Sequence, residues 1–198
     1  MEEKYLESSV DPIELFRLWM QDAEANEPND ANAVALATAT PEGRPSVRMV
    51  LVKGVDERGF AFYTNEESQK GIELKENPRA AMCFHWKSLR RQVRIAGSVM
   101  ELPAAEADRY FHTRSRLSQL AAAASEQSRL LPAREVLLAR VKELDARYPA
   151  EIPRPVYWKG FVLRPEQIEF WMSREGRLHD RVMFVRRGDG WERQRLYP

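Results

Sequence analysis

The stretch that decides the fold is residues 33–64, which read AVALATATPEGRPSVRMVLVKGVDERGFAFYT. It contains three apolar runs of strand length, at 33–40, 46–53 and 60–64. Proline, glycine and acidic residues separate the runs, at 41–43 (PEG) and 56–59 (DERG). Short connections of this composition are typical of turns between paired strands. The stretch therefore predicts an antiparallel three-stranded meander.

Helical and strand patterns follow one another on both sides of this meander. Asp11 and Pro12 provide a helix cap and a proline at the first helical position, which predicts a helix ending near Asn26. Further helices are expected at 68–76, 103–116 and 132–148. Further strands are expected at 80–86, 92–102, 160–164, 168–171 with continuation toward Arg181, 183–186 and 191–196. Many antiparallel strands interrupted by helices favour a mainly β fold, a barrel with appended helices.

Length and composition limit the function classes. The chain has 198 residues, so one domain spanning 1–198 is expected, with 1–10 as a flexible N-terminal segment. A composition that is 43% hydrophobic and 31% charged, with a net charge of +1, gives no general reason to expect nucleic acid as a partner. No segment resembles a secretory signal or reaches the length of a membrane span. We therefore expect a cytoplasmic protein with no membrane partner.

Cysteine and histidine usage removes several kinds of site. Cys83 is the only cysteine, which excludes an intramolecular disulfide, and its apolar neighbours favour a small buried hydrophobe over a nucleophile. The three histidines and one cysteine lack the spacing of zinc ligands, so no metal is expected, and His85 and His112 are interpreted as structural. The sequence also lacks a glycine-rich dinucleotide motif, a P-loop and a serine elbow.

The first candidate site is the segment 177–181, RLHDR. In an extended strand Arg177, His179 and Arg181 would project to one face, because side chains alternate with a period of two. Two guanidinium groups around an imidazole would suit a phosphate or a carboxylate. The alternative interpretation is the solvated outer face of an edge strand.

The second candidate is the segment 48–53, RMVLVK, an apolar strand with a cation at each end. Arg48 and Lys53 are separated by an odd number of residues, so in a regular strand they would face opposite sides. They would then serve different anions, or different parts of one ligand bound across the strand edge. Alternatively, the two charges mark where a buried strand meets solvent.

The third candidate lies where a predicted strand gives way to a helix. Tyr63 and Thr64 end the strand, and Ser68, Gln69 and Lys70 open the helix. Free backbone N–H groups at a helix N-terminus, together with a lysine, would make a phosphate cradle. Ordinary helix capping by Ser68 explains the same residues equally well.

The fourth candidate belongs to the helix expected at 103–116. Tyr110 and Arg114 are four residues apart and would share one helix face, with Ser118 just beyond. A phenol, a guanidinium and a hydroxyl group would bind a small phosphate, although a solvated helix face gives the same pattern. Weaker polar candidates are Gln92, which could hydrogen-bond the edge of a heteroaromatic ring, and the pair Gln127 and Ser128.

Taken in order, these segments resemble the pyridoxine (pyridoxamine) 5'-phosphate oxidase family from about Asp11 to Pro198. The motifs that carry the resemblance are RMVLVK at 48–53, FYTN at 62–65, SQK at 68–70, RQV at 91–93, YFHTR at 110–114, SQ at 118–119, QS at 127–128, EFW at 169–171 and RLHDR at 177–181. The resemblance implies an FMN-binding split β-barrel, antiparallel and Greek-key-like, with peripheral α-helices. It also implies a homodimer with FMN at the subunit interface.

The same resemblance implies a role for each site residue. FMN would contact Arg48, Met49, Val50, Leu51, Tyr63, Thr64, Gln69, Lys70, Gln92, Gln127, Ser128, Trp171 and Arg181. The substrate would contact Lys53, Tyr110, Arg114, Ser118, Arg177 and His179. Arg177 and His179 would be the catalytic residues, because they would fix the pyridine ring and stabilise charge in the transition state.

The implied reaction oxidises C4' of pyridoxamine or pyridoxine 5'-phosphate to the aldehyde of pyridoxal 5'-phosphate, with O2 as acceptor and H2O2 as by-product. The alternatives are a related flavin oxidase of phenazine biosynthesis and a non-catalytic FMN-binding barrel. Tyr110, Arg114 and Ser118 favour the phosphorylated vitamin over the phenazine substrate. Arg177 and His179 favour catalysis over simple flavin binding.

Three features depart from the family pattern. Gln69 occupies a position where many members carry arginine, which removes one charge-assisted contact to phosphate. The run LAAAA at 120–124 replaces a common Gly-Ala-Trp sequence and is expected to alter a loop near the substrate phosphate. The N-terminal segment lacks the arginine- and tyrosine-containing lid of some members.

Overall fold

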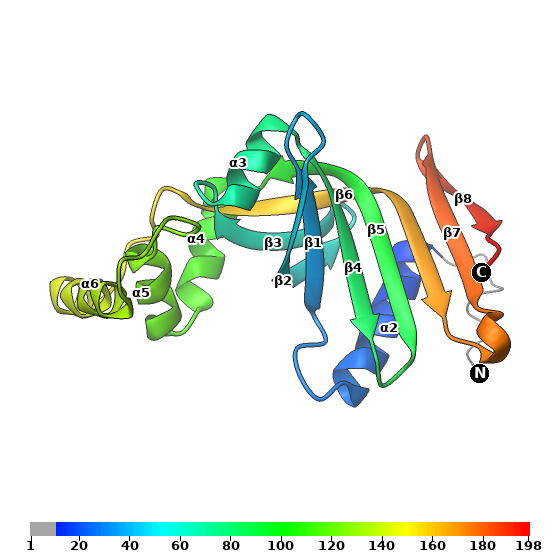
Figure 1. The fold of residues 1–198 in the computed structure, drawn as a ribbon, viewed down its shortest axis with the longest axis horizontal. Coiled ribbons are helices and arrows are strands. Elements are labelled where there is room, and N and C mark those ends of the chain that lie inside the picture. Colours follow the sequence, from blue (N-terminus) through cyan, green and yellow to red (C-terminus); the bar gives the residue numbers. More distant parts are fainter. Residues whose placement is uncertain (1–10) are drawn as a thin grey trace.

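The computed structural model describes residues 11–198, so the segment 1–10 and the question of its lid lie outside the described residues. Within that range eight strands form one antiparallel sheet in the order β3-β2-β1-β4-β5-β6-β7-β8 (Figure 1). The strands are β1 Ala33–Ala39, β2 Pro45–Asp56, β3 Gly59–Asn65, β4 Arg79–Trp86, β5 Arg91–Glu101, β6 Trp158–Met172, β7 Asp180–Arg187 and β8 Gly190–Arg195. A further pairing of β3 with β6 closes the first six strands of this order into a barrel, and β7 and β8 extend beyond it. The predicted antiparallel split barrel is confirmed.

The predicted meander is confirmed, with one irregularity that matters for the site. β1 and β2 pair without interruption from Ala33 opposite Leu51 to Ala39 opposite Pro45. The pairing of β2 with β3 shifts register after Val52, so that Lys53 is an extra residue on β2. A β-bulge of this kind re-aims the side chains that follow it.

β6 is one long strand where the sequence predicts two short ones. Its first part pairs with β3 and its second part with β7, while β5 runs beside both. Pro165 falls inside it, at a register shift opposite Gly97. A Cβ atom on Gly97 would lie 2.0 Å from the carbonyl oxygen of Arg164, so the two backbones approach closely there. The bulge accommodates the proline, which is why the interruption in the sequence does not end the strand.

The helix α2 (Pro12–Asn26) packs its apolar side against the barrel and fills its core. The ring of Phe16 lies 4.8 Å from that of Phe60, and Trp19 lies 5.1 Å from Phe170, both edge to face. Burial of each such side chain contributes about 1.5–3 kcal/mol. The predicted cap is confirmed, because the carboxylate of Asp11 accepts a 2.8 Å hydrogen bond from the backbone N–H of Ile13.

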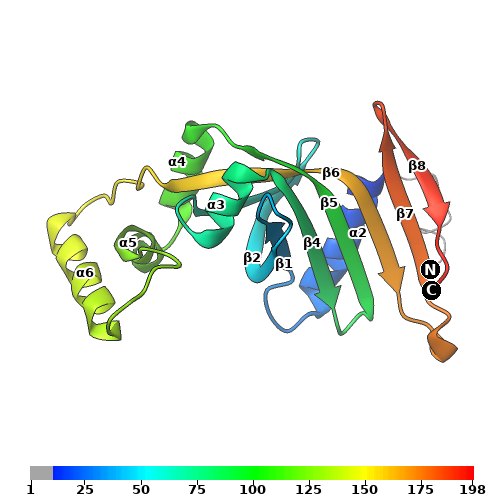
Figure 2. The same cartoon turned by 45° about the horizontal axis from the view of Figure 1, so that its top comes forward.

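The remaining helices are α3 (Gln69–Glu76), α4 (Ala104–Thr113), α5 (Arg116–Ala124) and α6 (Arg134–Arg147). Figures 1 and 2 both show α5 and α6 standing to one side of the barrel, with α4 between them and β3. No helix in the part of the chain that the structure describes is long and apolar enough to cross a membrane.

Two predictions about these helices are wrong. The helix expected at 103–116 ends at Thr113, and Arg114 is its extended C-cap residue, so Tyr110 and Arg114 do not share one continuous helix. The run 120–124, expected to alter a loop, is the second half of α5. Leucine and alanine have high helix propensity, and Ser115 caps the new helix by accepting from the backbone N–H of Ser118.

Candidate active site

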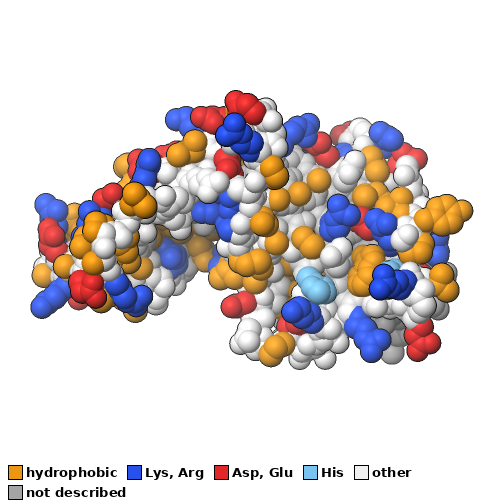
Figure 3. All heavy atoms as spheres, viewed as in Figure 1, with side chains coloured by type: hydrophobic (Ala, Val, Ile, Leu, Met, Phe, Trp, Pro, Cys, Tyr) orange, Lys and Arg blue, Asp and Glu red, His pale blue; other side chains and the backbone are white. Residues whose placement is uncertain are grey.

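A pocket of about 740 Å³ lies between the barrel strands β2 and β3 and the helices α3, α4 and α5. Figure 3 shows a hollow between the helical lobe and the barrel, with lysine or arginine side chains along its edge. The predicted site residues that line the pocket are Arg48, Met49, Val50, Leu51, Lys53, Tyr63, Thr64, Gln69, Lys70, Tyr110, Arg114, Ser118, Gln127 and Ser128. Segments far apart in the sequence therefore meet at one place.

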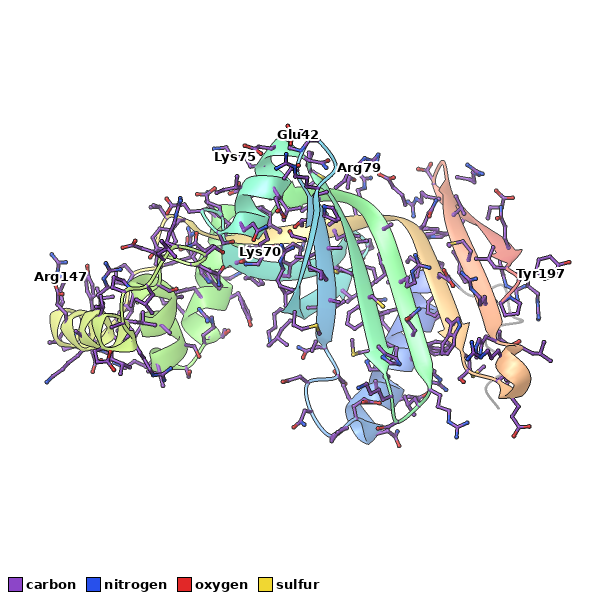
Figure 4. The ribbon with its side chains drawn as sticks, viewed as in Figure 1. Glu42, Lys70, Lys75, Arg79, Arg147 and Tyr197 are labelled. Carbon is purple, nitrogen blue, oxygen red and sulfur yellow. The ribbon has the colours of Figure 1, made fainter. Side chains whose placement is uncertain are left out.

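Lys70 is the buried cation of this pocket (Figure 4). Its ammonium group donates to Thr64 Oγ1 at 3.2 Å, to Ser68 Oγ at 3.1 Å and to Gln127 Oε1 at 2.9 Å. All three acceptors are neutral. Burial, with a smaller contribution from the charge of Arg48, lowers the pKa of Lys70 to about 8. A buried ammonium group surrounded by neutral acceptors is stabilised by a bound anion.

The loop after α5 contributes to the same cluster. Gln127 lies between Lys70 and Thr64, and Ser128 Oγ accepts a 3.2 Å hydrogen bond from the backbone N–H of Gln69. Ser128 has a φ of 71°, a left-handed conformation that costs a residue other than glycine of order 1 kcal/mol. Although the sequence singles out Gln127 and Ser128 only weakly, both lie at the first turn of α3. The capping interpretation is confirmed for Ser68, while Gln69 and Lys70 line the pocket and the phosphate cradle remains a prediction.

A buried carboxylate holds the neighbouring wall. Glu73 accepts hydrogen bonds from Thr38, from Ser46 at 2.6 Å, from Gln69 at 3.0 Å and from Arg48 at 3.4 Å. Burial opposes its charged form, but these hydrogen bonds and the charge of Arg48 outweigh it, so the pKa of Glu73 is lowered. Glu73 therefore stays ionised and fixes the side chains of Arg48 and Gln69 at the pocket.

An aromatic stack forms the opposite wall. The rings of Tyr63 and Tyr110 are stacked at 4.2 Å, and the ring of Trp158 is stacked on Tyr63 at 5.3 Å. The guanidinium carbon of Arg114 lies 5.1 Å from the centroid of Trp158, and its buried Nη1 has no hydrogen-bond partner among the described residues. Burial raises the pKa of Tyr110 and lowers that of Arg114. An unpaired guanidinium nitrogen beside a phenol suits a phosphate group.

The odd spacing of Arg48 and Lys53 does not separate them. Both border the same pocket, because Lys53 is the extra residue of the bulge in β2 and the alternation of a regular strand does not hold across it. The expectation that they face opposite sides is wrong for this chain. Whether they serve different anions or different parts of one ligand remains a prediction.

The remaining predicted residues lie elsewhere. Gln92, Trp171 and Arg181 are neighbours across β5, β6 and β7, and none of them lines the pocket. Arg177 lies in a 3₁₀ turn before β7 and His179 lies just after that turn, and neither residue lines the pocket. Figure 1 shows this end of β6 and β7 at the opposite side of the barrel from α5 and α6. We refer to these five residues as the C-terminal cluster.

The expected strand alternation at 177–181 is wrong. Gly176 and Arg177 have φ values of 62° and 63°, so the chain turns there and β7 begins only at Asp180. Arg177 is exposed, whereas the ring of His179 lies 4.5 Å from that of Trp171. Arg181 Nε donates to the buried Glu169 at 2.7 Å. Arg177, His179 and Arg181 therefore do not lie on one strand face.

The sequence does not identify four residues that line the pocket: Ser46, Val47, Ser115 and Trp158. Ser115 carries a recognisable signal, because a serine three residues before Ser118 fits a helix cap. Trp158 carries only a weak one, as a large aromatic residue that follows a proline-rich connector and opens a strand.

Comparison with known proteins identifies the family of the chain. Residues 20–148 match the family model described as pyridoxamine 5'-phosphate oxidase. Residues 158–198 match the model described as the pyridoxine 5'-phosphate oxidase C-terminal dimerisation region. The chain belongs to the pyridoxamine 5'-phosphate oxidase family. The resemblance stated from the sequence motifs is thereby confirmed.

Individual members of the family cover almost the whole chain. A pyridoxine/pyridoxamine 5'-phosphate oxidase of Gluconobacter oxydans is 58% identical and covers 98% of this chain and 97% of its own length. One from Sinorhizobium fredii is 59% identical and covers 95% and 93%. Among solved structures, PhzG from Burkholderia lata, in complex with tetrahydrophenazine-1-carboxylic acid, is 34% identical with a TM-score of 0.94 and covers 100% of this chain and 98% of its own.

Proposed function

We propose that this protein is an FMN-dependent oxidase that converts pyridoxamine or pyridoxine 5'-phosphate to pyridoxal 5'-phosphate with O2 as acceptor, releasing H2O2. The observation that carries the proposal is a pair of cations in one pocket, Lys70 and Arg114, neither of which donates a hydrogen bond to a carboxylate of the described chain. Two such cations suit two phosphates, one from FMN and one from the substrate. The names and high identity of the family relatives support the same assignment.

The pocket fits FMN in size and in donor chemistry. Its volume of about 740 Å³ is within the range of cofactor sites. Lys70, Thr64, Gln127 and Ser128 would hold the phosphate, while β2 from Arg48 to Leu51 would run along the rest of the molecule. FMN, when bound, supplies the two-electron acceptor for the oxidation. The expected loss of one charged contact at Gln69 remains a prediction.

The substrate would bind to the pocket residues that do not hold FMN. Arg114, Tyr110 and Ser118 would hold the phosphate group, and the exposed Lys53 would approach it from the bulge in β2. Fixing the phosphate orients the reacting carbon, and orientation is a large part of what a protein contributes when its cofactor performs the oxidation.

The C-terminal cluster would complete the site of a second subunit. None of its residues lines the pocket of its own chain, and Figure 1 shows the end of β6 and the start of β7 on the side of the barrel away from α5 and α6. Four of its five residues, all but Gln92, lie within 158–198, the region that matches the family's dimerisation model. In a symmetric homodimer, Arg177 and His179 of one subunit would then contact the substrate ring in the pocket of the other, and Gln92, Trp171 and Arg181 would contact its FMN.

The structural similarity to PhzG favours one alternative, a flavin oxidase acting on a phenazine precursor. The two functions differ at the phosphate, because a reduced phenazine carboxylic acid offers a carboxylate but no phosphate ester. The retention of Arg114, Tyr110 and Ser118 together in the pocket favours the phosphorylated vitamin.

One assay tests the proposal. Protein loaded with FMN is mixed with pyridoxine 5'-phosphate in air, and pyridoxal 5'-phosphate and H2O2 are measured. We expect equal amounts of the two products, no turnover of unphosphorylated pyridoxine, and none of a dihydrophenazine carboxylic acid. Flavin-loaded protein that forms neither product from pyridoxine 5'-phosphate is not this oxidase, and turnover of the phenazine alone supports the alternative.

A further inference from the structure

Arg114 differs from the other shielded arginines of the described chain. Six further arginines are buried or half-buried, and each forms an ion pair with a carboxylate: Arg48 with Glu73, Arg91 with Asp22, Arg116 with Asp145, Arg154 with Asp108, Arg174 with Asp180 and Arg181 with Glu169. Arg114 forms none within residues 11–198, and its buried Nη1 lacks a hydrogen-bond partner there. Its pKa is lowered by this burial. The guanidinium group of Arg114 must therefore be held in place by groups other than a carboxylate.

Aromatic faces take the place of the carboxylate. The guanidinium carbon lies 5.1 Å from the ring centroid of Trp158 and 5.9 Å from that of Phe111. A tryptophan face attracts a cation through its quadrupole, most strongly where water is excluded, and Trp158 is only 6% exposed. Such a contact leaves the charge and the N–H donors of Arg114 available. A carboxylate would neutralise the charge and repel an incoming phosphate.

Trp158 is itself held from several sides. Its ring stacks on Tyr63 at 5.3 Å with an interplanar angle of 10° and meets Phe111 edge to face at 5.1 Å. Its carbonyl oxygen accepts a 2.6 Å hydrogen bond from Arg154, which also donates to Asp108 of α4 at 2.6 Å. The indole thus connects the barrel strand β3 to the helix that precedes Arg114.

We propose that Trp158 is a positioning residue that holds Arg114 by its ring face, and so keeps an unneutralised guanidinium ready for the phosphate of the substrate. The inference rests on the proposed function, and it assigns to Trp158 the selection of a phosphorylated over an unphosphorylated substrate. Trp158 acts through Arg114 and does not contact the reacting atoms.

The test compares Trp158→Leu, Trp158→Phe, Arg114→Ala and the double variant Trp158→Leu/Arg114→Ala, all as FMN-loaded protein. We expect Trp158→Leu to raise KM for pyridoxine 5'-phosphate about tenfold, the size of a partly desolvated cation–π contact, with kcat and FMN affinity little changed. Trp158→Phe, which keeps an aromatic face, should recover most of the loss. The double variant should be no worse than Arg114→Ala, because residues that act through one another are not additive.

Several results would overturn the proposal. An unchanged KM in Trp158→Leu, or effects of the two substitutions that multiply in the double variant, would show that Trp158 does not act through Arg114. Loss of FMN affinity with an unchanged KM would show that Trp158 supports FMN binding and not substrate binding. If Trp158→Leu fails to fold, Trp158→Phe, Arg114→Ala and their double variant give the same comparison with a smaller expected change in KM. If the two changes in KM multiply in that double variant, the proposal is contradicted as well.

A second readout separates this inference from the proposed function. Inorganic phosphate is titrated into the FMN-loaded wild type and Trp158→Leu, and its dissociation constant is measured by calorimetry. Weaker phosphate binding in Trp158→Leu is expected even if the wild type oxidises no vitamin B6 phosphate, in which case only the proposed function fails. Equal phosphate binding in the two proteins contradicts the role of Trp158.

Discussion

At the scale of single residues, the pocket shows two ways of keeping a charge among buried groups. Lys70 donates only to neutral oxygens, whereas Arg48 is paired with the ionised Glu73. The first arrangement leaves the cation dependent on a ligand anion, and the second fixes a side chain in the absence of ligand. The two arrangements therefore predict different experiments, one on binding and one on stability.

The binding of FMN by the apoprotein should weaken above about pH 8. The pKa of Lys70 is about 8 without ligand, and a bound phosphate dianion raises it, so binding requires a proton once the pH exceeds 8. The dissociation constant should rise by only about twofold from pH 7 to 8 and then by up to about tenfold per pH unit, the limit for one linked proton. Fluorescence titration measures it. In Lys70→Met binding should be weak and independent of pH, and a flat profile in the wild type would exclude this role.

Removal of the Glu73 carboxylate should destabilise the protein. Glu73→Ala leaves the hydroxyl groups of the buried Thr38 and the half-buried Ser46 without this acceptor, and the charge of Arg48 without its carboxylate. The expected loss in the free energy of unfolding is about 3 kcal/mol, typical of breaking a buried ion pair. Urea denaturation of the apoprotein measures it. Glu76→Ala, at an exposed position of the same helix, is the matched control and should be near neutral; equal stability of the two variants would show that the Glu73 network contributes little.

At the scale of elements, the sequence predicts well what depends on local pattern. The meander of 33–64 and the cap of α2 by Asp11 both follow from turn and capping residues a few positions apart, and both are confirmed. The sequence also predicts the pocket segments of β2, β3 and α3, because cations and hydroxyl groups mark the ends of these strands and this helix.

One of the misses depends on tertiary pairing, and two depend on local backbone geometry that the sequence marks weakly. The bulge at Lys53 arises in the pairing of β2 with β3. The odd spacing of Arg48 and Lys53, considered on one strand alone, therefore does not predict the faces on which they lie. The break between α4 and α5, which places Arg114 in an extended conformation, is not marked by any proline or glycine. The positive φ of Arg177, a residue that seldom adopts it, ends the expected strand before the chain reaches β7.

The close approach of β5 and β6 should tolerate no side chain at Gly97. An added Cβ would lie 2.0 Å from the carbonyl oxygen of Arg164 and 3.0 Å from the backbone nitrogen of Glu166, and neither backbone can yield without moving the bulge. Gly97→Ala is expected to lower the free energy of unfolding by about 2–3 kcal/mol, the upper range for overpacking. Thermal and urea denaturation check it. Gly54→Ala, whose new Cβ would meet only Ala61 at 3.8 Å, is the control; matching stabilities would mean that β6 shifts freely.

At the scale of the whole molecule, the family's motifs fall into two groups that the described chain does not bring together. The pocket is built from 46–128 and Trp158, whereas the C-terminal cluster lies on the far side of the barrel (Figure 1). Sequence order does not reveal this division, because motifs of both groups alternate along one chain, with Gln92 between Lys70 and Tyr110. The closure of the barrel by β3 and β6, with β7 outside it, separates the two groups.

Mixed dimers test whether each site takes residues from two subunits. Lys70→Ala should inactivate the pocket and a combined Arg177→Ala/His179→Ala variant the C-terminal cluster, so each homodimer should be inactive. After subunit exchange of equal amounts, half of the dimers are mixed, and each of these has one site with an intact pocket and an intact cluster. Activity should therefore recover to about a quarter of the wild-type value, as symmetry requires for an isologous dimer.

Steady-state oxidation of pyridoxine 5'-phosphate before and after subunit exchange measures this recovery, with each variant exchanged against itself as the control. If both groups served the same chain, mixing would restore nothing, because every chain in the mixture carries a defect.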